Sequence, residues 1–141
     1  MRPARLPSRG TAGAVLAVIG AIFIGYVGIS YLLTPASMAP AFGLPSRPRA
    51  EGAGFLAVKG IRDVVSGLVI LTVLLAGNRR VLGWVVLVTA LTPLGDMILV
   101  LGSGGAAATA FGVHGATAAA VVLAGGLLLS GARPRPATPA P

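Results

Sequence analysis

Four apolar runs of about 20 residues or more dominate this chain and leave it few ways to fold. They cover residues 11–33, 53–76, 81–101 and 106–130. A helix of about 20 residues, rising about 1.5 Å per residue, crosses the ~30 Å hydrocarbon core of a bilayer. We therefore predict an all-α fold, an integral membrane bundle of four transmembrane helices.

The composition indicates that the bilayer is the solvent of this chain. Of its 141 residues, 55% are hydrophobic and only 10% are charged, whereas soluble domains carry about 25% charged residues. The net charge of +8 could indicate nucleic-acid binding. The arginines, however, lie in tails and short connections, as membrane topology requires, so we expect no nucleic-acid partner.

The segments between the runs define the predicted domain organisation. Residues 77–80 and 102–105 are short enough for tight helical hairpins, whereas residues 34–52 carry four prolines and predict an irregular loop or a short interfacial segment. Residues 1–10 form a basic N-terminal tail, residues 11–131 the transmembrane domain, and residues 132–141 a disordered proline-rich tail.

The distribution of arginines predicts the orientation in the membrane. In a four-helix topology the N-terminal tail, residues 77–80 and the C-terminal tail share one side and carry seven arginines, against two in residues 34–52. Loops rich in Lys and Arg stay in the cytoplasm. We therefore expect a multi-pass protein of the cell (inner, cytoplasmic) membrane, with both termini cytoplasmic.

Small residues recur every four positions in two of the runs, which predicts close helix packing. The first run has them at residues 13, 17, 21 and 25, and the last run at residues 108, 112, 116, 120 and 124. These faces could pack within one bundle or join protomers of a homo-oligomer. Simple richness in alanine and glycine is the alternative interpretation.

Three charged residues interrupt the second run. Lys59, Arg62 and Asp63 lie at positions i, i+3 and i+4 and therefore share one helix face. An ionisable group at membrane depth costs about 2.5–3.5 kcal/mol on insertion scales. Such groups persist where they face a bundle interior, pair with each other or serve a ligand.

The third and fourth runs add Asp96 and His114. In the predicted topology all these residues lie in the extracytoplasmic half of their helices. We therefore predict one polar pocket that opens outward and is lined by Lys59, Arg62, Asp63, Asp96 and His114. Pro93, just before Asp96, is expected to kink its helix and widen the bundle there.

A purely structural interpretation stands beside the pocket. Asp63 could pair with Lys59, and Arg62 with Asp96, and such pairs would only fix the helix register. Lys59 could also extend toward the membrane surface, and His114 could be an interior hydrogen-bonded residue. Trp84 and Tyr31 are expected to be membrane-interface anchors.

The chain has few residues that could bind a metal or a cofactor. The chain has no cysteine, one histidine and three acidic residues. Thiolate and multi-histidine ligand sets are therefore excluded, and we expect neither a metal site nor a cofactor.

Several short segments together resemble a known family. The segment KGIRD at residues 59–63 is followed by Gly67, by the arginine pair at residues 79–80, by PLGD at residues 93–96 and later by His114. This pattern, from about residue 14 to residue 129, resembles an uncharacterised family of small four-helix membrane proteins, domain of unknown function 4267 (DUF4267). The resemblance implies a compact four-span protein and importance for Arg62, Asp63, Asp96 and His114, but it supplies no reaction.

Three functions fit these residues. The first is to bind or move a small amphipathic ligand, with Arg62 and Lys59 holding an acidic or carbonyl group. The second is a structural or accessory subunit whose buried charge pairs fix assembly. The third is an isomerase- or cyclase-like enzyme on a lipophilic substrate, with Asp63 or Asp96 as acid and His114 as base. The bilayer, a small lipophilic ligand and further copies of the chain are the expected partners.

Overall fold

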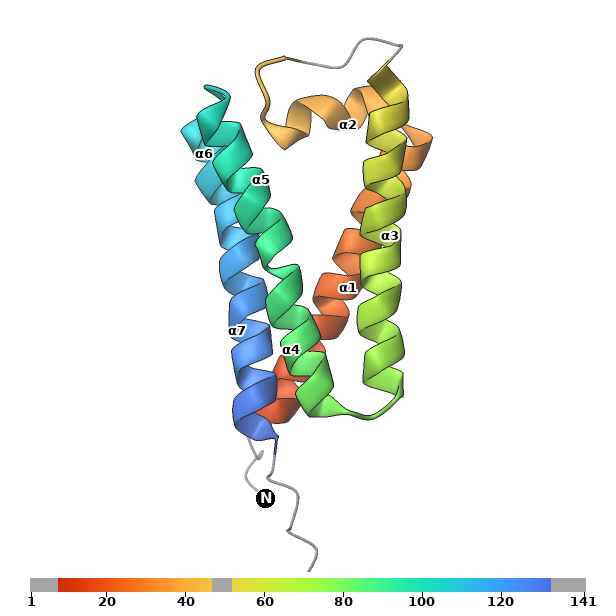
Figure 1. Ribbon diagram of the computed structural model, residues 1–141, viewed down its shortest axis with the longest axis vertical. Coiled ribbons are helices and arrows are strands. Elements are labelled where there is room, and N and C mark those ends of the chain that lie inside the picture. Colours follow the sequence, from red (N-terminus) through yellow and green to blue (C-terminus); the bar gives the residue numbers. More distant parts are fainter. Residues whose placement is uncertain (1–7, 47–51, 133–141) are drawn as a thin grey trace, which may run out of the picture.

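A computed structural model describes residues 8–46 and 52–132 (Figure 1). Every described element is a helix, so the all-α prediction is confirmed for this part of the chain. The elements are α1 (Arg9–Leu33), α2 (Pro35–Phe42), α3 (Ala53–Leu75), α4 (Arg79–Thr89), α5 (Leu91–Gly102), α6 (Ala107–Thr109), the π-helix η2 (Ala110–Gly115) and α7 (Ala116–Gly131). Most of the two predicted tails, residues 1–7 and 133–141, lies outside the described residues.

In the part of the chain that the structure describes, three long helical stretches have the length and apolar composition needed to cross a membrane. They are Arg9–Leu33, Arg79–Gly102 and Ala107–Gly131. Large apolar side chains and Trp84 are exposed along the outside of the molecule, which indicates a membrane protein because soluble monomers rarely expose such continuous apolar surface. Helix α3 is 23 residues long but carries three charges, so length and composition alone do not establish the predicted fourth span.

Short side-chain caps and left-handed glycines define where the helices begin and end. Ser8 Oγ accepts a hydrogen bond from the Thr11 amide at the start of α1, and Asn78 Oδ1 accepts one from the Val81 amide at the start of α4. Such caps satisfy amides that have no partner inside the helix. Gly77, at φ +76°, turns the chain between α3 and α4, as expected for a tight hairpin.

The proline-rich connection contains a helix of its own. Its first part forms α2, with Pro35 in the first turn, where a missing amide costs nothing. Gly43 ends α2 with φ +94°, a conformation that favours glycine. Helix α2 lies across one end of the molecule, between α1 and α3 on one side and α5 and α6 on the other (Figure 1).

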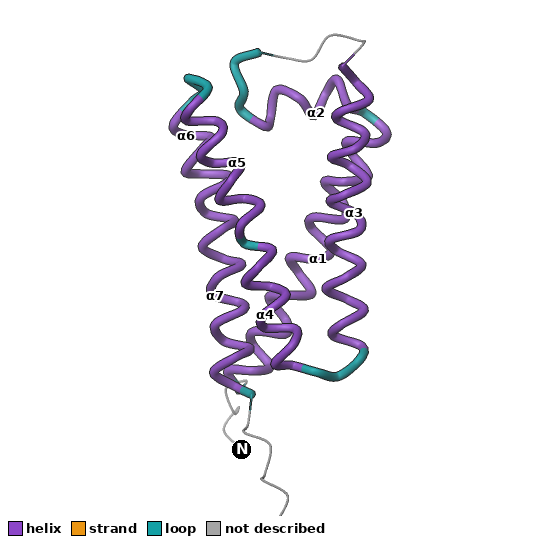
Figure 2. The backbone as a smooth tube through the Cα atoms, viewed as in Figure 1, coloured by secondary structure: helices purple, strands orange, loops and turns teal. Residues whose placement is uncertain are grey.

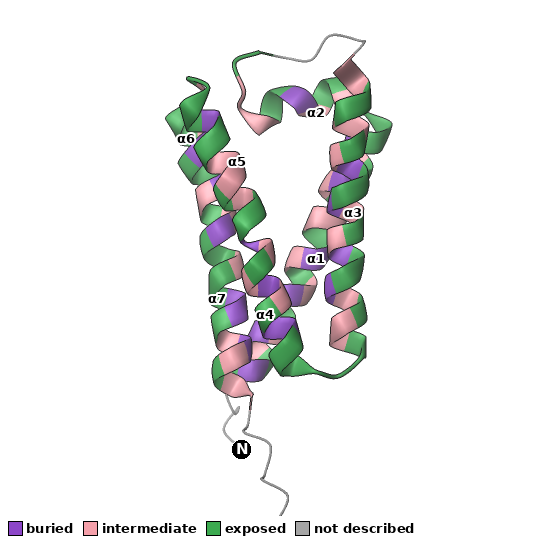
Figure 3. Ribbon diagram, in the orientation of Figure 1, coloured by how far each residue is buried: buried purple, intermediate pink, exposed green. Residues whose placement is uncertain are grey.

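The apolar core lies in the opposite half of the bundle, nearer the N-terminus (Figure 3). Its buried side chains come from α1, α3, α4 and α7: Ala17, Ala21, Ile70, Leu82, Val86, Ala124 and Leu128. Helices α1 and α3 approach closely through glycine, because a Cβ on Gly28 would lie 2.6 Å from the Gly60 carbonyl oxygen. This close approach is the packing that small residues permit in lipid.

The two predicted small-residue faces differ in how far they are buried. In α1, Gly13, Ala17 and Ala21 are buried, and Gly28 continues that face. In the last helical stretch only Ala124 of the predicted stripe is buried, whereas residues 108, 112, 116 and 120 are exposed. Residues 116, 120 and 124 all lie in α7, where a strict spacing of four runs about 40° ahead of the helical period at each step, so the three do not share one face. Association between protomers through the exposed stripe stays a prediction.

Toward the α2 end, the helices separate into two pairs. Helix α1 packs along α3, and α5 packs along η2, and the two pairs diverge from the apolar core toward α2 (Figure 1). Helices α4 and α5 form one rod that is interrupted at Ala90 (Figure 2). Pro93 cannot donate to the carbonyl of Thr89, and the helix is interrupted next to that residue. The predicted widening of the bundle at Pro93 stays a prediction.

Candidate functional site

The polar residues meet at the end of the bundle that α2 covers. Lys59 and Asp63, one turn apart on α3, form an ion pair of 2.6 Å between Nζ and Oδ2. The Asp63 side chain is buried and the Lys59 side chain is 25% exposed. An i, i+4 pair of this kind neutralises two charges that a bilayer would otherwise have to accommodate.

Two aromatic rings face the Lys59 ammonium group. Its Nζ lies 4.9 Å from the centroid of the Tyr31 ring on α1 and 5.6 Å from that of the Phe42 ring on α2. A cation over an aromatic face is stabilised by the ring quadrupole, and more strongly where water is excluded. Lys59 therefore has a carboxylate and two rings around its charge, contributed by three helices.

The prediction that Tyr31 is a membrane-interface anchor is wrong. Its side chain is only 3% exposed, and its hydroxyl donates to the Met38 carbonyl of α2 at 3.4 Å. Tyr31 lies on the α1 face that carries Gly28 and packs against α3. A helical period of 3.6 residues, rather than a strict spacing of four, would have placed Tyr31 on that buried face.

His114 connects η2 to α2 and to α5. Its Nε2 lies 2.8 Å from the Phe42 carbonyl oxygen, and since a carbonyl only accepts, Nε2 must carry the hydrogen. The other ring nitrogen, Nδ1, faces Asp96 Oδ2 at 3.9 Å. The His114 ring also packs against the Phe42 ring, with centroids 4.9 Å apart.

The helix geometry around His114 is unusual. It lies in the π-helix η2, between Ala110 and Gly115, and its side chain is buried. A π-turn inserts an extra residue into a helix and re-aims one side chain, and such turns are frequent at functional sites. Here the turn directs the histidine toward α2 and α5 rather than outward.

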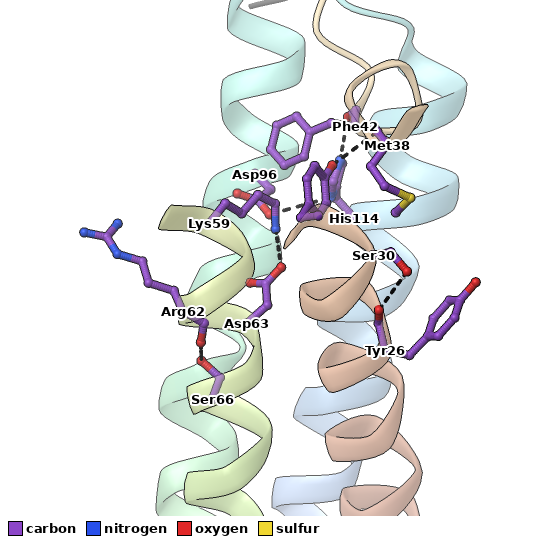
Figure 4. A network of polar contacts seen from close by, with 11 residues as sticks. Tyr26, Ser30, Met38, Phe42, Lys59, Arg62, Asp63, Ser66, Asp96 and His114 are labelled. Carbon is purple, nitrogen blue, oxygen red and sulfur yellow. Dashed lines mark hydrogen bonds and ion pairs between the residues drawn. The ribbon is translucent and has the colours of Figure 1, made fainter. Parts of the chain in front are cut away.

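Arg62 does not join these residues. Its side chain is exposed, and the guanidinium group points away from the other four (Figure 4). Among the described residues no ion pair connects Arg62 to Asp96. Of the five predicted pocket residues, the structure thus brings together Lys59, Asp63, Asp96 and His114, which we call the polar cluster.

The buried polar side chains of the described residues have hydrogen-bond partners. Within this part of the chain, no buried side-chain nitrogen or oxygen lacks a hydrogen-bond partner. No group of three or more metal-ligating side chains occurs there either. A shallow, mostly apolar hollow lies on the outer face of α1, away from the polar cluster, and is lined by Ile19, Ile22, Phe23 and Tyr26.

The fold and the cluster define the class of this molecule: an all-helical membrane protein with ionisable side chains gathered inside one end. Residues 20–128 match the family described as a domain of unknown function, DUF4267. This match covers most of the chain and every member of the polar cluster, so the chain belongs to that family. No curated protein and no solved structure shows significant similarity to it.

Proposed function

We propose that this protein crosses the membrane four times and binds a small amphipathic ligand at the polar cluster, on the extracytoplasmic side. The ammonium group of Lys59 is the observation that supports binding most directly. An ammonium has three hydrogen-bond donors, and within the described residues Lys59 uses one of them, toward Asp63. The side chains of Lys59 and Asp96 are 25% and 22% exposed, so a polar group can reach both.

The proposed fourth span is α3. At 23 residues it is about 35 Å long, which suffices for the hydrocarbon core. Two of its three charges neutralise each other in the Lys59–Asp63 pair. It also packs closely along α1, where a Cβ on Gly67 would lie 2.6 Å from the Ala21 carbonyl oxygen. These features support insertion of α3 beside α1.

The position of the polar cluster favours binding over transport. The cluster occupies only the half of the bundle near α2. In the other half the centre is filled by Leu82, Val86 and Leu128, all at most 2% exposed. Such close packing leaves little room for a ligand to pass beyond the cluster. The proposed ligand therefore enters and leaves on one side.

The same geometry supports a second candidate, an acid–base enzyme on a lipophilic substrate. Asp96 and His114 are the observation that favours it, since their facing atoms lie 3.9 Å apart and both groups can exchange protons. The satisfied hydrogen bonds of the buried polar atoms fit a third possibility, an accessory subunit whose charges fix assembly.

Native mass spectrometry in a mild detergent tests the proposal. The protein is purified as wild type, as the double variant Lys59→Met/Asp63→Asn and as Arg62→Gln. The double variant removes the ammonium without leaving a buried carboxylate unpaired. The matched control Arg62→Gln removes a neighbouring cation that points away from the cluster.

The proposal expects a co-purifying small molecule in the wild type and in Arg62→Gln, and its loss from the double variant. Loss from both variants would point to a general effect of positive charge rather than to a site at Lys59. A double variant that changes oligomeric state while the wild type carries no ligand would support the accessory subunit. Conversion of the bound molecule by the wild type but not by His114→Gln would support the enzyme.

A further inference from the structure

The charges of the polar cluster restrict the chemistry of any ligand, and this inference rests on the proposed function. Lys59 and Asp63 carry opposite charges on atoms 2.6 Å apart. Their sum is zero. The charge that remains depends on Asp96 and His114.

One proton makes the pair of Asp96 and His114 neutral as well. The Nε2 atom of His114 already carries a hydrogen, because it donates to the Phe42 carbonyl oxygen. Without a further proton, the lone pair of Nδ1 would face the Asp96 carboxylate at 3.9 Å, which is repulsive. A single proton on either residue removes that repulsion, and the Asp96–His114 pair then sums to zero in both arrangements.

The other described charges lie elsewhere. Arg62 points away from the cluster (Figure 4). Arg79 lies beside Gly10, at the opposite end of the bundle, and Arg9 and Arg80 belong to the same end. Among the residues that the structure describes, none therefore offers a spare counter-charge to an ion at the cluster.

The surroundings of the cluster make a missing counter-charge costly. The rings of Tyr31 and Phe42 cover the Lys59 ammonium, and Asp63 and His114 are buried. In such a partly desolvated place, an unpaired ion is costly. An uncharged acceptor avoids that cost and still meets the unused donors of Lys59.

We propose that the ligand of the polar cluster presents an uncharged hydrogen-bond acceptor, such as a ketone, ester or amide carbonyl, on an apolar body. A carboxylate would compete with Asp63 and Asp96 for a single ammonium. A cationic amine would face Lys59 itself. The site therefore selects a neutral amphiphile over acidic or basic amphiphiles of the same length.

Three probes of matched chain length test this selection: 2-undecanone, decanoate and decylamine. Each is added at equal concentration to the detergent-purified wild-type protein, and the bound fraction is measured by native mass spectrometry. We expect the ketone to be retained about tenfold or more over both ions, since an uncompensated charge costs at least 1.4 kcal/mol at such a site. Wild-type preference for decanoate or decylamine would overturn this selection while leaving the binding function standing.

The variant Asp63→Asn provides the sharper test. Its amide oxygen can still accept from Lys59, but the cluster now carries one net positive charge. Decanoate should then gain at least about tenfold relative to the ketone, whereas Arg62→Gln should keep the wild-type ranking. An unchanged ranking in Asp63→Asn would overturn charge neutrality as the basis of selection.

The two proposals fail in distinguishable ways. Retention of all three probes at the same level by wild type and by Lys59→Met/Asp63→Asn would show that nothing binds at the cluster, and the binding function would fall. Retention that depends on Lys59 but follows a different order of probes would overturn only the ligand class.

Discussion

Lys59 shows how a charged residue can be accommodated in an otherwise apolar helix. Its charge is met by Asp63 on the same helix, and its ammonium lies over rings from α1 and α2. The sequence predicts the carboxylate contact, because i and i+4 residues share a helix face. It could not predict the ring of Phe42, whose position depends on how α2 folds back over the bundle.

Breaking the Lys59–Asp63 pair from one side should be more harmful than removing both charges. Lys59→Met leaves Asp63 buried without its cation, and the loss of one partner of a buried pair costs about 3 kcal/mol. We expect a clear fall in the unfolding temperature in detergent, measured by circular dichroism. The double variant Lys59→Met/Asp63→Asn should recover most of that loss.

One result would contradict the expected loss of stability in Lys59→Met. Equal unfolding temperatures for Lys59→Met and wild type would mean that Asp63 finds solvent or another partner, and the buried ion pair would contribute little to stability. Arg62→Gln is the matched control and should change the unfolding temperature little, because exposed charges contribute within about 0.5 kcal/mol.

At the scale of elements, two helical irregularities create the site. The interruption at Ala90 separates α4, which packs in the apolar core, from α5, which carries Asp96. The π-helix η2 turns His114 toward the Phe42 carbonyl. Pro93 predicts the first irregularity from the sequence. The second has no comparable signal, since the residues 110–115 contain no proline and their glycines are common throughout the chain.

The seam between α1 and α3 depends on individual glycines. A Cβ on Gly28 would lie 2.6 Å from the Gly60 carbonyl oxygen and 2.7 Å from the Val64 amide nitrogen. Both neighbours are backbone atoms, so Gly28→Ala must push the helices apart. We expect a loss of about 1–3 kcal/mol, the usual cost of overpacking, seen as a lower unfolding temperature in detergent.

Gly25 provides the matched control on the same helix. A Cβ there meets nothing within 4 Å, so Gly25→Ala should leave stability unchanged or raise it by up to about 1 kcal/mol through helix propensity. Equal losses for Gly28→Ala and Gly25→Ala would contradict the packing of α1 on α3.

At the scale of the molecule, the sequence predicts the all-α class and the long helical stretches well, because apolar runs of membrane length are a strong signal. It predicts the site only in part. Lys59, Asp63, Asp96 and His114 meet as expected, whereas Arg62 lies outside and Tyr31 and Phe42 complete the site. The difference arises because spacing along one helix does not show how neighbouring helices are rotated about their axes.

The four-span topology can be tested because the chain contains no cysteine. Ser46 lies between α2 and α3, and Asn78 lies between α3 and α4, beyond the other end of α3. Both are exposed. If α3 spans the membrane, a membrane-impermeant maleimide should label Ser46→Cys in intact cells, and Asn78→Cys only after lysis. Ser103→Cys, at the α2 end, should behave like Ser46→Cys, since α4 and α5 return the chain to that side.

Labelling of Ser46→Cys and Asn78→Cys from the same side would show that α3 does not cross. The Lys59–Asp63 pair would then lie outside the hydrocarbon core, and the desolvation that makes the cluster select an uncharged ligand would be lost.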